Sequence, residues 1–263
     1  MSLTDKTIAS TFKDVLVIEN SNAGFDTNID QVKSGNGNGS SIYLSTNNLK
    51  VQPTSDSTTV FRINDKDGNF LLGVDSSNDT VVALGNNINT QYAYFGANYR
   101  DIGNYVADTH YPIPFSSSSG GVGSTNDVDF GTGTDPDDSY TTADTDTQYA
   151  AQIVPMMWLV PDNISIDSVT HIEGASIATG EVNRCHLKSF DFTSGSTSCL
   201  ANGTLLAHNS DVTNAGNEQA YLSTWTVDSA SVASGKVILC FFRSDSTVNS
   251  DYSLNVTIKY HLT

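Results

Sequence analysis

The first third of the chain alternates short apolar runs with turns rich in Asn, Asp and Gly. Three runs, Val60–Ile63, Phe70–Val74 and Val81–Leu84, stand within residues 58–85, and similar runs begin at Ile42. Four or five apolar residues between turn residues predict short strands without intervening helices. Loosely repeated units of this kind favour a β-stem or a small sandwich. Because strands this short bury little surface alone, neighbouring strands or other chains would have to cover their apolar faces.

The N-terminal segment carries a helix-like pattern. Ile8, Phe12, Val15 and Leu16 follow the i, i+4, i+7, i+8 spacing of one helix face. Residues 14–20, at the end of this segment, also fit a strand, so we expect a short helix to about Lys13 and then a strand. A helix of this length is marginal in water, so a partner is expected to order these four residues.

Alternation of apolar and polar residues is strongest from residue 151 to the C-terminus. A first strand is predicted where every second residue is apolar, at Val154, Met156, Trp158 and Val160. The next alternation runs through Ile164 and Ile166 and slips by one position at Val169. The cleanest alternation lies in the last segment, at Leu254, Val256, Ile258, Tyr260 and Leu262.

Further strands are predicted at 185–192, 204–210, 220–228 and 237–244, joined by loops without helices. Seven or eight such strands predict a β-sandwich over residues 151–263, with a jelly roll as the preferred topology. The expected fold class is therefore all-β, with an N-terminal β-rich anchor and stem followed by a C-terminal jelly-roll-like sandwich.

Two unlike segments separate these regions. Residues 86–115 hold seven aromatics among 30 residues without a clean period, which favours packing at a neck or subunit interface over a sugar platform. Residues 116–148 are rich in Ser, Gly, Thr and Asp and read as a long loop with almost nothing to pack. The predicted organisation is an anchor and stem over 1–85, a neck and linker over 86–150, and the sandwich.

Composition narrows the function classes. Twelve basic residues against 29 acidic ones give a net charge of −17, which disfavours binding to nucleic acid or to an anionic membrane. No apolar run is long enough for a secretory signal or a membrane span, so synthesis and folding in a cytoplasm are expected. The three cysteines, Cys185, Cys199 and Cys240, are expected to be reduced and mostly buried.

The search for catalytic patterns favours a protein that is not an enzyme. There is no GxSxG motif and no HExxH or HxH spacing, and no cofactor fingerprint is present. His171 and Glu173 share one strand face, which could hold a metal ion; an exposed polar pair is the favoured interpretation. No catalytic residue and no metal ligand is assigned.

Two acidic stretches raise the question of calcium. Asn64–Asn69 resembles the opening of a calcium loop but lacks its closing Glu, so a tight β-turn at Asp67-Gly68 is favoured. Asp135–Asp138 belongs to an acidic segment that could attract cations, with a solvated loop as the favoured alternative.

The stretch from Thr7 to Ser45, followed by Ser57 to Gly85, resembles the N-terminal halves of fibre and appendage proteins of tailed bacteriophages. In that pattern a virion-anchoring segment precedes small β units, and the matching letters here are Phe61, Ile63, Gly68, Asn69, Leu71, Leu72, Val74, Asp75 and Val81. The C-terminal part looks like the β-sandwich tips or decorating knobs of similar virion proteins. The motifs are degenerate, and the resemblance supplies no catalytic or ligand-binding residue.

This resemblance implies a virion location, a homotrimer, an N-terminal end that binds capsid or tail proteins, and an outward sandwich. The particle-anchoring residues would then be Ile8, Phe12, Val15 and Leu16. The chain is short for a tail fibre, so a head fibre or capsid-decorating protein fits equally well. The alternative function is a carbohydrate-binding module that recognises host surface glycan, with Tyr221, Trp225 or Tyr140 lining a groove.

Overall fold

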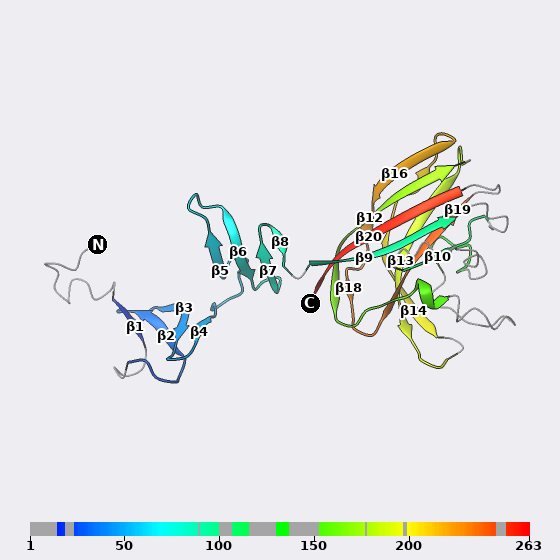
Figure 1. Cartoon of the computed structure of the whole chain (residues 1–263). Helices are drawn as coiled ribbons and strands as arrows, with labels where there is room; N and C mark the ends of the chain where they lie inside the picture. The colour runs from blue at the N-terminus through cyan, green and yellow to red at the C-terminus, as the bar shows by residue number, and fades with distance from the viewer. Residues whose placement is uncertain are drawn as a thin grey trace. The chain divides into compact units, whose positions relative to one another are not determined.

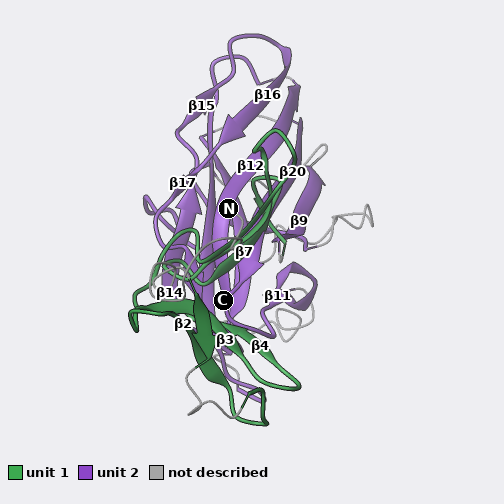
Figure 2. Cartoon of the chain, turned by 90° about the vertical axis from the view of Figure 1, so that its left-hand side faces the viewer, with its two compact units in different colours: residues 1–88 green, residues 89–263 purple. Residues whose placement is uncertain are grey.

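The structure, a computed structural model, is all-β and divides into two compact units, residues 1–88 and 89–263 (Figures 1 and 2). It describes residues 15–18, 24–88, 90–99, 107–115, 130–136, 153–176, 178–196, 199–245 and 251–263. Among the described residues, no helix is long and apolar enough to cross a lipid bilayer.

The first unit contains two four-stranded antiparallel sheets, each a meander of consecutive strands. Their strands are β1 (Leu16–Ile18), β2 (Asp30–Ser34), β3 (Gly39–Leu44), β4 (Leu49–Val51), then β5 (Phe61–Asn64), β6 (Phe70–Asp75), β7 (Thr80–Ala83) and β8 (Asn86–Asn87). The three short apolar runs predicted as strands coincide with β5, β6 and β7. The strand predicted after Lys13 is β1, whereas the helix predicted before it lies outside the described residues.

A tight turn joins β5 to β6, as the sequence predicted. The Asp65 carboxylate accepts hydrogen bonds from the backbone N–H of Asp67 (2.9 Å) and of Asn69 (2.8 Å). Gly68 has a φ of +84°, which a glycine adopts without strain. The side-chain amide of Asn69, followed by these backbone donors, holds the pKa of Asp65 below its usual value. The oxygens of this stretch therefore serve the turn itself.

The second unit is a β-sandwich of two antiparallel sheets. The β9 sheet has the order β16-β12-β20-β9, and the β19 sheet has the order β10-β19-β13-β14-β17. Figure 1 shows β12, β20 and β9 side by side. The strands are β9 (Thr90–Tyr99), β10 (Tyr111–Ile113), β11 (Trp158–Leu159), β12 (Ile164–Ser176), β13 (Val182–Phe192), β14 (Leu200–His208), β15 (Val212–Thr213), β16 (Glu218–Thr224), β17 (Thr226–Val227), β18 (Ser231–Val232), β19 (Val237–Ser244) and β20 (Asp251–Leu262).

The strand order depends on pairing between early and late strands. The first strand, β9, pairs with the last, β20, and β10 pairs with β19. Both sheets thus join strands from the two ends of the unit, an arrangement compatible with the expected jelly roll. That finer topology stays a prediction.

The sandwich begins with β9, earlier than the sequence predicted. β9 pairs with β20 over ten residues, and Phe95 of β9 is fully buried in the core. The predicted neck thus supplies an edge strand of the sandwich. The alternation in β9 escaped detection because its outward positions are also apolar: Tyr92 and Tyr94 face away from the core that Ala93 and Phe95 enter.

Two apolar clusters cover both faces of the β19 sheet. The larger one lies between the two sheets and includes Trp158, Leu187 and Val256. The smaller one lies against the other face of the β19 sheet and includes Phe130, Phe190 and Phe241. Phe130 comes from the segment expected to be a loop with nothing to pack, so at least its described part, residues 130–136, belongs to the sandwich.

The entry to the sandwich differs from the strand predicted at Val154–Val160. Val154–Met156 forms a 3-10 turn, and only Trp158–Leu159 is a strand. Pro155 lacks the backbone N–H that a strand would use and suits the first turn of a helix. The predicted slip at Val169 is confirmed, because β12 contains a bulge between Ile166 and Ser168.

Candidate functional site

The predicted anchoring residues fall at the edge of the described chain. Ile8 and Phe12 lie outside the described residues. Val15 and Leu16 are 38% and 75% exposed, and Leu16 pairs with Ser34 at the edge of the first sheet. The structure therefore leaves the Leu16 side chain largely exposed and the Val15 side chain partly exposed.

An apolar face on the β5–β8 sheet is the clearest candidate surface of the first unit. Phe61 of β5 lies opposite Val74 of β6, which lies opposite Val81 of β7. The next row is formed in the same way by Ile63, Leu72 and Ala83. We call these six residues the stem face. They share one side of the sheet because paired residues in adjacent strands point the same way.

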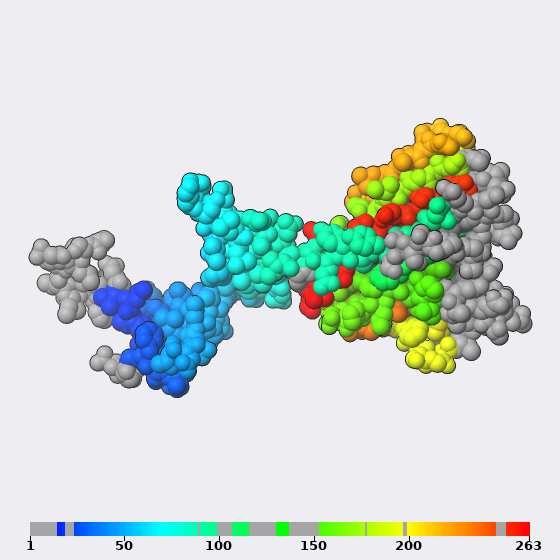
Figure 3. Space-filling model, in the orientation of Figure 1, coloured from blue at the N-terminus to red at the C-terminus, as the bar shows by residue number. Residues whose placement is uncertain are grey.

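The stem face is not covered by the other described residues of the first unit. Phe61 and Ile63 are 39% and 42% exposed, and the other four side chains are only half-buried. Among the described residues of the first unit, drawn from blue to cyan in Figure 3, only Val32, Gly73 and Thr80 are buried. A sheet of four short strands needs a covered apolar face for stability, so this unit lacks a core of its own.

A chain of buried polar groups crosses the interior of the sandwich. The indole Nε1–H of Trp225 donates to Nδ1 of His171, and Nε2 of His171 lies 3.4 Å from a carboxylate oxygen of Glu173. The amide of Asn183, from the opposite sheet, donates to the other oxygen of Glu173 at 2.7 Å. All four side chains are buried. The favoured prediction of an exposed polar pair at His171 and Glu173 is therefore wrong.

The bulge in β12 explains why this pair lies inside. After the bulge, Val169 points into the core, so every second residue from it, His171, Glu173 and Ala175, does the same. The slip at Val169 was visible in the sequence, and continuing its phase would have found the buried pair. Polar residue type argued for the opposite face.

A second set of buried polar side chains lies on β13, where residues 130–136 pack against the sheet. Lys188 is buried and its Nζ donates to the carbonyl of Pro136 at 2.8 Å. The His186 ring is fully buried with no hydrogen bond; the Asp135 carboxylate is 3.3 Å from its Nε2. Burial, with the neighbouring His110 as the second cause, lowers the pKa of His186 to about 2. Asp135, predicted in an acidic loop, thus lies against the sheet.

Of the three aromatic residues proposed to line a sugar groove, the structure describes Trp225 and Tyr221, and neither is freely exposed. Trp225 is buried, and Tyr140 lies outside the described residues. Tyr221 is half-buried, and its hydroxyl donates to the backbone carbonyl of Thr213 at 3.3 Å. Within the described residues, a glycan site would therefore use side chains other than Tyr221 and Trp225.

Burial lowers the reactivity of the three cysteine thiols. Cys185, Cys199 and Cys240 are buried as predicted, and burial raises the pKa of each thiol, which disfavours the reactive thiolate. Within the described ranges, no three His, Cys, Asp or Glu side chains are grouped so as to bind a metal ion. No protein-family model matches the chain, and the search of curated proteins finds no significant match.

Proposed function

We propose that this chain is a non-enzymatic structural virion protein of a tailed phage, a trimeric fibre, spike or capsid-decorating protein. Its N-terminal region binds the particle and its sandwich projects outward. The observation that carries this proposal is the uncovered stem face in a unit without its own core.

The stem face requires a permanent partner. Six apolar side chains in two adjacent rows remain partly in water, and their burial would supply the stability that the first unit lacks. Five of these residues, Phe61, Ile63, Leu72, Val74 and Val81, are also letters of the phage-fibre resemblance. The resemblance and the exposed face therefore point to the same residues.

Copies of the same chain are the partners that fit this face. Chains of net charge −17 repel one another, but the stem face contains no charged residue, so contact there brings no like charges together. Closed rotational symmetry covers the same patch on every chain. A trimer also multiplies weak contacts of each N-terminal region with the particle.

The sandwich, unlike the first unit, has an apolar core of its own. Its core holds more than twenty buried side chains contributed by both sheets, with Phe95, Val256 and Phe242 fully buried. It therefore needs no partner for its core, which suits an outward domain held by a multimeric stem.

Light scattering of the full chain tests the oligomeric part of the proposal. We expect about 84 kDa, three times the chain mass of 28.1 kDa. A clean monomer that stays monomeric at high concentration would contradict the proposal.

Deletion of Ser2–Asn20 tests the particle-binding part. The truncated protein should keep its folded sandwich but no longer join particles in an assembly assay. The control is the double variant Asn36→Ser/Asn38→Ser, which changes two exposed side chains between β2 and β3 and leaves the N-terminal segment intact. It should join particles as the native chain does. If the truncated chain also joins particles as well as the full chain, the N-terminal end is not the anchor.

A further inference from the structure

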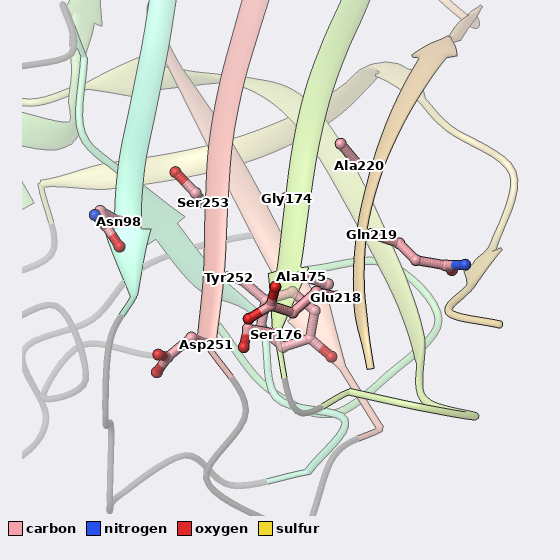
Figure 4. A pocket seen from close by; sticks show the side chains of 10 residues that line it. All are labelled: Asn98, Gly174, Ala175, Ser176, Glu218, Gln219, Ala220, Asp251, Tyr252 and Ser253. Atoms are coloured by element: carbon pink, nitrogen blue, oxygen red, sulfur yellow. The ribbon is translucent and has the colours of Figure 1, made fainter. Parts of the chain in front are cut away.

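A hollow of about 610 Å³ lies on the outer face of the β9 sheet, away from the core (Figure 4). It crosses all four main strands of this sheet. Its outward lining residues are Asn98 of β9, Ser253 and Asp251 of β20, Gly174 and Ser176 of β12, and Glu218 and Ala220 of β16. This volume is in the range of about 300–1,000 Å³ that is usual for small-molecule sites.

The register of the sheet produces the hollow. Asn98 pairs with Ser253, Ser253 with Gly174, and Gly174 with Ala220, so one row across the sheet carries no large apolar side chain. A Cβ built on Gly174 would meet nothing closer than the Cβ of Ser253, at 3.9 Å. The space above Gly174 is therefore open.

Polar groups gather at one end of this hollow. Ser176 pairs with Glu218 on one side and with Asp251 on the other, which puts two carboxylates around one hydroxyl. Figure 4 shows Ser176 and Glu218 close together at this end. With the Asn98 amide and the Ser253 hydroxyl, the lining offers both acceptors and donors to a ligand.

An apolar pair adjoins the hollow on its other side. Ile172 and Leu222 pair directly with each other in the row next to Gly174 and Ala220. They are 58% and 76% exposed, although each lies in a strand of the sandwich. The surface thus combines an apolar shelf with a polar hollow.

We propose that this hollow binds a saccharide that is uncharged or carries an amino sugar. Sugar hydroxyls both donate and accept hydrogen bonds, which suits carboxylates, an amide and hydroxyls together, and the C–H face of a sugar ring suits an apolar shelf. Glu218, Asp251 and the net charge of −17 disfavour uronic acids, phosphosugars and nucleic acid. The site is separate from the stem face and does not depend on it.

The test uses the full chain on an array of immobilised neutral, N-acetylated, amino and acidic oligosaccharides, followed by calorimetry with the strongest soluble one. We expect binding to neutral, N-acetylated or amino oligosaccharides and not to acidic ones. Gly174→Gln, which fills the hollow, should weaken the affinity by at least about tenfold. The double variant Glu218→Gln/Asp251→Asn keeps the shape and should also weaken it.

Thr224→Gln is the matched control. It adds a side chain of the same kind to β16 on the same outer face but outside the hollow, so affinity should stay unchanged. Near-native circular dichroism of each variant shows that the sandwich is folded. Absence of binding across the array, binding to acidic glycans alone, or full affinity in Gly174→Gln would overturn the proposal.

Discussion

The indole Nε1 of Trp225 donates a 2.7 Å hydrogen bond to Nδ1 of His171, and both side chains are buried in the sandwich. An indole N–H can only donate, so Nδ1 accepts, and the neutral ring carries its proton on Nε2, facing Glu173. This contact links β12 to the end of β16 and connects the buried Glu173 to the rest of the core.

Trp225→Phe should destabilise the sandwich, because it leaves Nδ1 of His171 buried without a donor. Trp158→Phe removes another buried indole of the same size and serves as the control. We expect Trp225→Phe to cost about 1–3 kcal/mol more of the free energy of unfolding than the control. Urea denaturation measures it, since each variant keeps one tryptophan in the sandwich as a fluorescent probe. Equal losses would mean that the hydrogen bond contributes nothing.

His186 should contribute to the pH dependence of the free energy of unfolding. Its pKa is about 2 in the folded protein and about 6.5 when unfolded, so protons favour the unfolded chain. The stabilising contribution is complete above pH 6.5 and falls by up to about 1.4 kcal/mol per pH unit below it. His186→Leu should show a shallower loss of stability between pH 7 and pH 5.

The buried Leu206 provides the control for this experiment. Leu206→Val removes apolar volume from the core without changing a titratable group, so it should keep the pH slope of the native protein. Denaturation curves at the two pH values measure the slope. The same slope in His186→Leu and the native protein would show that the buried ring does not titrate on unfolding.

Two fragments test whether the sandwich begins at residue 89, as in the structure, or at residue 151, as the sequence suggested. Residues 89–263 should fold alone, whereas residues 151–263 lack β9 and β10 and lose Phe95 and Ile113 from the core. Thermal melts followed by circular dichroism should be cooperative for the longer fragment only. Cooperative unfolding of the shorter fragment would restore the boundary at residue 151.

Ile63→Asp should dissociate the proposed trimer, because it places a charge in the stem face. Arg62→Asp also adds an acidic side chain to β5, but at the neighbouring position, whose side chain points to the opposite side of the sheet, and should leave the mass unchanged. Sedimentation velocity would show about 28 kDa for Ile63→Asp and the native mass for the control. A native mass for Ile63→Asp would exclude the stem face as the contact between chains.

The sequence predicted the strands where burial follows a simple local pattern. In β20, Leu254, Val256 and Ile258 alternate with polar residues and are buried, as expected. β5, β6 and β7 were visible from a second local signal, because turn residues bound each apolar run. The pleat of a strand turns every second side chain to one face, so the pattern is written locally in the chain.

Only the tertiary structure decided which distant segments share a core. β9 joins β20 across more than 150 residues, Phe130 covers the β19 sheet, and Trp225 and Asn183 supply hydrogen bonds to the buried His171 and Glu173. The hollow likewise depends on four strands being aligned in one register. Such relationships are set by the geometry of pairing between remote strands, which the local order of polar and apolar residues does not encode.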